Sequence, residues 1–144
     1  MQGPMDQAAM KQQLGKIPLF SGLSSKALHT LAVTAADKSY RAGDVIVKQG
    51  EKSFGLFIIV DGKADVEKSG KTVATLGQGQ FFGEMALLDE EPRTATVKAA
   101  TPCRCIVVYS WEFWSSVGKD PEALRSLLKE SVRRLRGSSP GPED

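Results

Sequence analysis

The stretch that decides the fold is residues 81–96, whose sequence is FFGEMALLDEEPRTAT. Its two ends carry the aromatic and β-branched residues of short strands, whereas residues 84–88 are good helix formers. Gly83 stands directly before them, and a ligand can approach the backbone closely there because glycine has no Cβ. The first amides of such a helical turn have no partner inside it and carry partial positive charge. The stretch therefore predicts an anion site of modest strength between two strands.

Two oppositely charged side chains, Glu84 and Arg93, flank this loop, and Pro92 stiffens the approach to Arg93 by fixing its own φ. An arginine offers a planar fork that matches two phosphate oxygens, and a carboxylate can accept a hydrogen bond from a sugar hydroxyl. The loop has no GxxxxGK[ST] motif and no set of carboxylates for magnesium, which argues against a triphosphate. A singly charged phosphodiester joined to a ribose fits better.

The run GEMAL at 83–87, followed by RTAT at 93–96, resembles the phosphate-binding cassette of the cyclic-nucleotide-binding domain family. That family includes cAMP- and cGMP-dependent kinase regulatory domains, nucleotide-gated channels and the sensor domain of the bacterial catabolite activator. The resemblance extends over residues 19–135. It implies a regulatory sensor for cAMP, cGMP or both, with no catalytic residue, no metal and no cofactor beyond this ligand. The ligand contacts that it implies are Phe82, Gly83, Glu84, Met85, Ala86, Leu87, Arg93, Thr94 and Ala95.

Several of these residues also have a plainer interpretation. Arg93 could be a strand arginine at the surface, and Glu84 could only stabilise the first turn of a helix. Leu87 and Leu88 are more typical of a core than of a ligand contact. Thr94 is a β-branched residue that suits any strand. In cGMP-preferring relatives a threonine at this place also bonds the guanine amino group, but cAMP responders carry it too, so the preferred base stays open.

The chain as a whole predicts an α+β fold that is mainly β, an antiparallel β-roll or jelly-roll barrel with N-terminal and C-terminal helices packed at one side. We expect helices in residues 1–39, the roll in 40–109 with the cassette at 81–96, further helices in 110–136 that act as hinge and lid, and a disordered tail at 137–144. Asp6, Ser24, Ser110 and Asp120 are the expected helix caps. The pairs Asp61-Gly62 and Ser69-Gly70 predict tight hairpin turns.

Two sets of apolar residues are candidates for the nucleotide base. Val66, Val73 and Leu76 in the predicted strands could line a base pocket, with ordinary core packing as the alternative. In the last helix an apolar stripe repeats at helical spacing, and the resemblance implies that this helix covers the base. Leu124, Leu127 or Leu128 could then cover the purine face and Arg125 could stack on it. Otherwise the stripe packs permanently on the barrel or pairs with another subunit.

The composition of the chain argues against several other classes of function. The formal net charge of +2 does not by itself indicate nucleic acid, and the residues after Leu135 are too few for a helix-turn-helix. The sequence has no long apolar run, so we expect no transmembrane helix. Cys103 and Cys105 suit two buried thiols in one strand better than a disulfide, so we expect a cytoplasmic protein. With His29 as the single histidine, a metal-dependent jelly-roll enzyme is unattractive. The expected partners are a cyclic mononucleotide and an unidentified effector. The alternative is the same fold used as a ligand-independent protein-interaction module.

Overall fold

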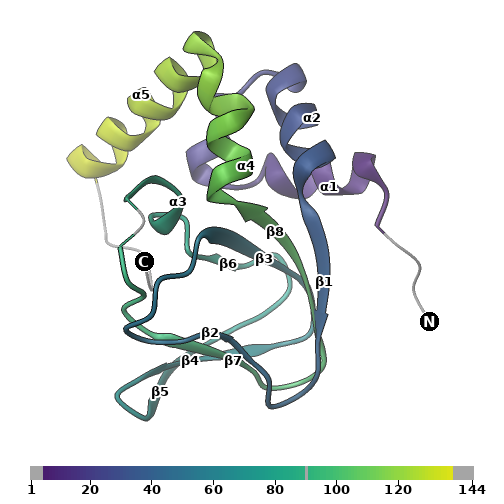
Figure 1. Cartoon of the computed structure of the whole chain (residues 1–144), viewed down its shortest axis with the longest axis vertical. Coiled ribbons are helices and arrows are strands. Elements are labelled where there is room, and N and C mark those ends of the chain that lie inside the picture. The colour runs from purple at the N-terminus through teal and green to yellow at the C-terminus, as the bar shows by residue number, and fades with distance from the viewer. Residues whose placement is uncertain (1–4, 90, 138–144) are drawn as a thin grey trace. The chain divides into compact units, whose positions relative to one another are not determined.

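The computed structural model describes residues 5–89 and 91–137, and the described chain divides into two compact units (Figure 1). The β unit runs from Ala36 to Ser110. The helical unit contains the described residues up to Ala35 together with those from Trp111 onward. The segments of the helical unit are therefore far apart in sequence, whereas the β unit is essentially one continuous segment.

Among the described residues, the strands of the β unit form two four-stranded antiparallel sheets. The first sheet has the order β1 (Ala36–Tyr40), β8 (Cys103–Tyr109), β3 (Gly55–Asp61) and β6 (Phe81–Phe82). The second has the order β2 (Val45–Val47), β7 (Thr96–Ala99), β4 (Ala64–Lys68) and β5 (Lys71–Leu76). The short helix α3 (Ala86–Asp89) lies between β6 and β7 in the chain. This arrangement confirms the predicted mainly antiparallel β fold with added helices.

The core of the β unit is built from both sheets. Alternate residues of each strand point to the same face of a sheet, so every second position can enter one core. In β8, Cys103, Cys105 and Val107 belong to this core cluster, and Phe57 and Ile59 join it from β3. Both cysteines are buried free thiols, as their spacing predicts.

Of the two predicted hairpin turns, one is confirmed and one is wrong. Ser69 and Gly70 join the paired strands β4 and β5 with φ values of 51° and 82°, the positive pair that a two-residue type I′ turn needs. Asp61-Gly62 instead leads from β3 in one sheet to β4 in the other, so it closes no hairpin. Gly62 is still required there, because a Cβ would meet the backbone of Pro102 and Cys103.

The β unit begins earlier than expected. The segment predicted as helical, residues 1–39, ends in a strand, because β1 covers Ala36–Tyr40. Its sequence, ADKSY, contains no β-branched residue and no apolar alternation, and only Tyr40 favours a strand, so the local signal is weak. Pairing with β8 creates it, with an ion pair between Asp37 and Arg104 at 2.5 Å. Conversely, the strand expected from Thr94 starts only at Thr96.

Three of the four predicted helix caps are confirmed in the described chain. The helical unit contains α1 (Gln7–Leu14), the 3₁₀ turn η1 (Pro18–Phe20), α2 (Ser25–Thr34), α4 (Ser110–Ser115), the 3₁₀ turn η2 (Val117–Lys119) and α5 (Pro121–Gly137). The side chains of Asp6, Ser24 and Asp120 each accept a hydrogen bond from an amide in the first turn that follows. Ser110, expected as a cap, is instead the first residue of α4.

Within the helical unit, the rings of Phe20 and Phe113 stack with centroids 6.2 Å apart. Of the tail predicted at 137–144, Gly137 is the last residue of α5, and 138–144 lie outside the described residues. In the described part of the chain, none of the helices has the length and apolar character needed to cross a membrane.

Candidate functional site

The cassette predicted at 81–96 folds as a strand, a tight turn and a short helix. Strand β6 ends at Phe82, Gly83 follows with φ +83°, and α3 begins at Ala86. A Cβ on Gly83 would lie 2.5 Å from the carbonyl oxygen of Gly55 and would overlap the guanidinium of Arg93. Glycine is therefore needed here for two reasons, its left-handed backbone and the close approach of the arginine.

The guanidinium of Arg93 lies inside the β unit. Arg93 is 2% exposed, and its Nη2 donates to the carbonyl oxygen of Gly55 at 2.5 Å and to Ser53 Oγ at 3.4 Å. The central carbon of the guanidinium lies 5.9 Å from the centroid of the Phe57 ring, which stacks on Phe82 with centroids 5.0 Å apart. This burial excludes the interpretation of Arg93 as a surface arginine of a strand.

The backbone of Arg93 is fixed by the loop between β2 and β3. The Arg93 amide donates to the carbonyl oxygen of Glu51 at 3.0 Å, and its own carbonyl oxygen accepts from the Gly50 amide at 2.8 Å. A side chain with four rotatable bonds is thus held at its base by backbone bonds and at its tip by Gly55 and Ser53. Sequence reasoning did not select these supporting residues. The supporting bonds come largely from backbone atoms, which leave no residue-type signal.

Glu84 is the second buried charged side chain of the cassette, at 3% exposure. Charged residues are almost never fully buried without a partner or a function. The helical turn does not include Glu84, since α3 begins at Ala86. The amides at 83–85 therefore precede the helix rather than belong to it.

The other predicted contacts of the cassette fall into a buried and an exposed group. Met85 is 38% exposed, and Thr94 is exposed. The buried residues of the cassette, besides Glu84 and Arg93, are Phe82, Gly83, Ala86, Leu87 and Ala95. Full burial of Leu87 agrees with its interpretation as a core residue.

The candidates for the base pocket do not share one environment. Val66 and Leu76 lie in the core cluster between the two sheets, as ordinary packing predicts. Val73 is 53% exposed, beside an irregularity in the pairing of β4 with β5, so it is not a core residue. In the helical unit, Leu124 and Leu128 are 36% and 65% exposed. Leu127 of the same stripe is 4% exposed, so the leucines of this helix do not share one environment either.

Among residues 5–89 and 91–137, no three His, Cys, Asp or Glu side chains come together in the way that a metal ion requires. The described cassette offers a buried guanidinium, a buried carboxylate and the backbone of a glycine turn, which are groups that can bind a phosphate and a hydroxyl.

Several known proteins are similar to this chain. The family profile of the cyclic nucleotide-binding domain matches residues 37–117. The chain is 36% identical over 129 residues to a cyclic nucleotide-gated potassium channel of Rhizobium etli, an alignment that covers 90% of this chain and 36% of the channel.

Two solved structures share the fold. The chain is similar to the N-terminal domain of a transcriptional regulator from Streptomyces coelicolor A3(2), with a TM-score of 0.79 at 26% identity, over 90% of this chain and 99% of that one. It is also similar to the regulatory domain of Toxoplasma gondii PKA, solved with cAMP, with a TM-score of 0.70 at 25% identity, over 88% and 50% of the two chains.

The matched region 37–117 contains the whole cassette and nearly all of the β unit. The chain itself spans little more than a third of the length of the Rhizobium channel. The buried glycine–arginine contact, the two sheets and the profile all lead to one assignment: the chain belongs to the cyclic nucleotide-binding domain family.

Proposed function

We propose that this chain is a regulatory sensor that binds cAMP or cGMP in the cassette and acts without catalysing a reaction. In this proposal Arg93 bonds the cyclic phosphate, Glu84 accepts from the ribose hydroxyl, and backbone amides near Ala86 and Ala95 complete the phosphate site. The observation that carries the proposal is the burial of the Arg93 guanidinium against Gly83, within the matched family motif.

The geometry around Arg93 suits a phosphate. A guanidinium has five N–H donors in a rigid fork, so one arm can bond the Gly55 carbonyl while the fork also bonds a ligand. The backbone bonds from Gly50 and Glu51 fix the arginine before the ligand arrives. Preorganisation of this kind reduces the entropy that binding must overcome.

The finer part of the proposal is that the ligand changes the position of α5. Leu124, Leu128 and Arg125 remain the candidates that cover the base, and the exposure of the two leucines supports their availability. A ligand shifts such an equilibrium only by the difference between its affinities for the two positions. Covering the base would supply that difference. The output then acts on an effector domain or protein that this chain does not identify.

A thermal-shift panel tests the ligand. At a hundred times its dissociation constant, a ligand that binds only the folded state adds about 2.7 kcal/mol to stability. For a chain of this size we expect the Tm to rise by roughly 5–10 °C. The panel contains cAMP, cGMP, cyclic dinucleotides, AMP and ATP. If neither cAMP nor cGMP raises the Tm, the result would favour the alternative, a ligand-independent interaction module.

Calorimetric titration of an arginine variant tests the site. Leaving a buried phosphate without its charged partner costs about 2–5 kcal/mol, so Arg93→Leu should lose roughly thirty-fold to several-thousand-fold in affinity. Arg41→Leu removes an exposed arginine of the same β unit and should stay within about twofold. Circular dichroism checks that both variants fold. Equal affinity of Arg93→Leu and wild type would refute the phosphate role.

A further inference from the structure

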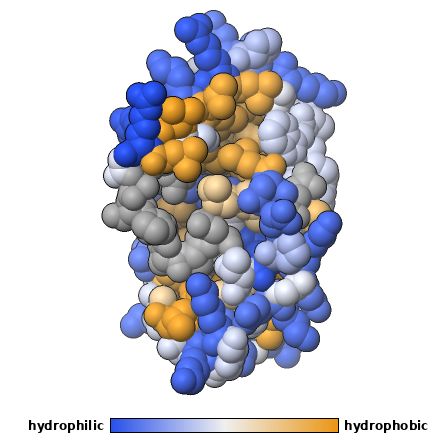
Figure 2. Space-filling view, turned by 90° about the vertical axis from the view of Figure 1, so that its left-hand side faces the viewer, coloured by the Kyte–Doolittle hydropathy of each residue, from blue (hydrophilic) through white to orange (hydrophobic). Residues whose placement is uncertain are grey.

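Helix α5 carries one long apolar stripe that no described element of the helical unit covers. On its inner side Ala123 and Leu127 are each 4% exposed, and the helix contacts η1 and η2 of the helical unit. On another side it exposes, over its full length, Leu124 at 36%, Leu128 at 65%, Val132 at 41% and Leu135 at 81%. In Figure 2 hydrophobic side chains gather into one patch in the upper part of the face drawn, with hydrophilic side chains at its border. A stripe of this length on a folded unit marks an interaction surface.

A second stripe, of cations, runs parallel to the first. Each exposed apolar residue is followed directly by a lysine or arginine, namely Arg125, Lys129, Arg133 and Arg136, all of them exposed. Successive residues lie about 100° apart around a helix, so these cations form one line beside the apolar line. The sequence of α5 holds five Lys and Arg residues against the two acids Glu122 and Glu130.

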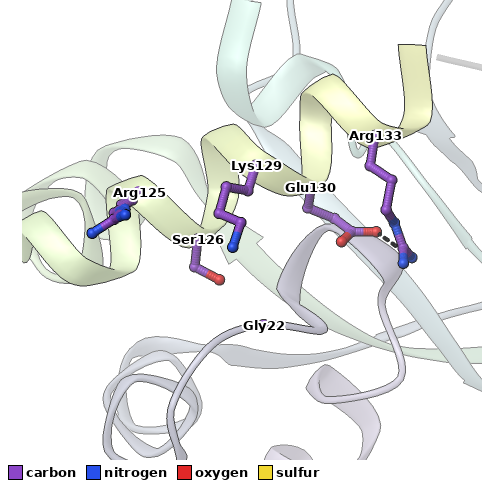
Figure 3. A pocket seen from close by; sticks show the side chains of 6 residues that line it. All are labelled: Gly22, Arg125, Ser126, Lys129, Glu130 and Arg133. Atoms are coloured by element: carbon purple, nitrogen blue, oxygen red, sulfur yellow. Dashed lines mark hydrogen bonds and ion pairs between the residues drawn. The ribbon is translucent and has the colours of Figure 1, made fainter. Parts of the chain in front are cut away.

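Little of this charge is used inside the helical unit. Figure 3 shows Lys129 and Ser126 extending from α5 on the side near Gly22, where they border a hollow of about 550 Å³. Arg133 bonds Glu130 at 3.1 Å, but the arginine side chain stays 78% exposed. An exposed ion pair of this kind contributes little and leaves the cation available to another anion.

We infer that α5 binds the surface of an anionic lipid bilayer and lies in its plane, as a basic amphipathic helix does. The apolar stripe would enter the boundary between headgroups and acyl chains. The cations beside it would reach the lipid phosphates with their long side chains. A helix of 17 residues is about 25 Å long, so all four apolar residues could be buried at once.

Charge complementarity favours this occupant over a second copy of the chain. An identical helix would bring the same line of cations and only two acids, one of them, Glu130, already bonded to Arg133. Like charges facing each other across an interface oppose association. An anionic bilayer instead supplies both an apolar layer and a dense negative surface.

Vesicle co-sedimentation of the whole chain, without nucleotide, tests this inference. We expect binding to phosphatidylcholine vesicles with about 30% phosphatidylserine, much weaker binding to phosphatidylcholine alone, and loss of binding as salt rises. Each cation near such a surface is worth about fivefold, so Lys129→Gln with Arg136→Gln should weaken binding roughly 25-fold. Leu135→Ser should weaken it about tenfold or more.

The matched control is Lys68→Gln with Lys71→Gln, which removes two exposed cations from the β4–β5 hairpin and should leave binding within about twofold. Circular dichroism must show unchanged helix content in every variant. Three results would overturn the inference: no binding to anionic vesicles, equal binding to neutral ones, or equal loss in the hairpin control. If light scattering shows that the wild-type chain is a dimer and Leu135→Ser a monomer, and the wild-type chain does not bind vesicles, the stripe would be assigned to self-association instead. Because Lys129, Arg136 and Leu135 lie outside the proposed nucleotide contacts, a failed nucleotide titration leaves this test intact.

Discussion

At the scale of single residues, the contact between Gly83 and Arg93 organises the site. The left-handed backbone at Gly83 and the missing Cβ let the guanidinium lie directly against the turn. Arg93 in turn reaches the carbonyl oxygen of Gly55, at the start of β3. One glycine therefore connects the shape of the turn to the position of the charged group.

Gly83→Ala should lose both stability and ligand affinity. An L-residue with positive φ costs about 1–2 kcal/mol, and the new methyl would also displace the guanidinium. We expect cyclic-nucleotide affinity to fall at least about tenfold, since 1.4 kcal/mol corresponds to a factor of ten. Urea unfolding and calorimetry measure the two effects separately.

Gly79→Ala is the control for this variant. Gly79 has φ +85°, but no described atom lies within 4 Å of the position that its Cβ would take. It shares the backbone cost of Gly83→Ala without the steric overlap. The free energy of unfolding of Gly79→Ala should fall by a similar amount because of the positive φ, while its affinity for the cyclic nucleotide stays unchanged. A fall in affinity as large as that of Gly83→Ala would show that the contact with Arg93 is not what matters.

The thiols in β8 make stability depend on alkaline pH. Burial, with a smaller effect from the neighbouring Cys103, raises the pKa of the Cys105 thiol from 9.0 to about 12. The folded state keeps the proton that the unfolded state loses. The stabilisation of the folded state by the protonated thiol is therefore complete below about pH 9 and is lost as pH rises toward 12. At about pH 10 the loss of stability from this thiol is on the order of 1 kcal/mol.

Burial also raises the pKa of Tyr40 to about 12, from 10.0, which adds a smaller loss in the same direction. The difference between the urea midpoints of unfolding at about pH 8 and pH 10 measures the combined loss of stability from these groups. In Cys105→Ala the fall between the two pH values should be smaller by the contribution of the thiol, whatever the absolute stability of the variant. An unchanged fall would contradict the assignment to Cys105.

At the scale of elements, helix starts are decided locally and strands are not. Asp120 accepts hydrogen bonds from the amides of Glu122 and Ala123 at 3.0 and 3.5 Å, and Pro121 occupies the first helical position. These contacts lie within four residues, so the sequence shows them. Strand β1 depends on pairing with β8, more than sixty residues away, and its own sequence contains only a weak sign of it.

Removing the cap of α5 should destabilise that helix measurably. Asp120→Ala leaves first-turn amides without their acceptor, and we expect a loss of about 1 kcal/mol. Asp120→Asn keeps an acceptor oxygen and should lose only a few tenths of a kcal/mol of stability. Thermal melts of the two variants, followed by circular dichroism, make the comparison. Equal melting of Asp120→Ala and wild type would mean that the cap is irrelevant to α5.

At the scale of the whole molecule, the question is whether the proposed ligand site in the β unit affects the helical unit. If α5 responds to the ligand, cAMP or cGMP should slow amide hydrogen exchange in residues 121–137 as well as in the cassette. Mass-spectrometric exchange with and without ligand measures this. Arg93→Leu, which should not bind, is the control and should show neither effect. Protection confined to the cassette would separate binding from any movement of α5.

The sequence by itself determined what depends on neighbouring residues. The caps at Asp6, Ser24 and Asp120 and the turn at Ser69-Gly70 act between residues close in the chain, so residue type and spacing were enough. The cassette motif was likewise visible as a short run of residue types at fixed spacing. The family followed from the same local motif. These features are properties of short segments and need no knowledge of the rest of the fold.

Only the tertiary structure decided what depends on distant partners. The role of Asp61-Gly62 as a passage between sheets, the strand at Ala36–Tyr40 and the exposure of the α5 stripe each depend on which element lies alongside. The burial of Arg93 likewise depends on Gly55 and on the loop at 50–51, some forty residues earlier. Burial and pairing are set by long-range contacts, and a local pattern cannot encode the identity of a partner that arrives from elsewhere in the chain.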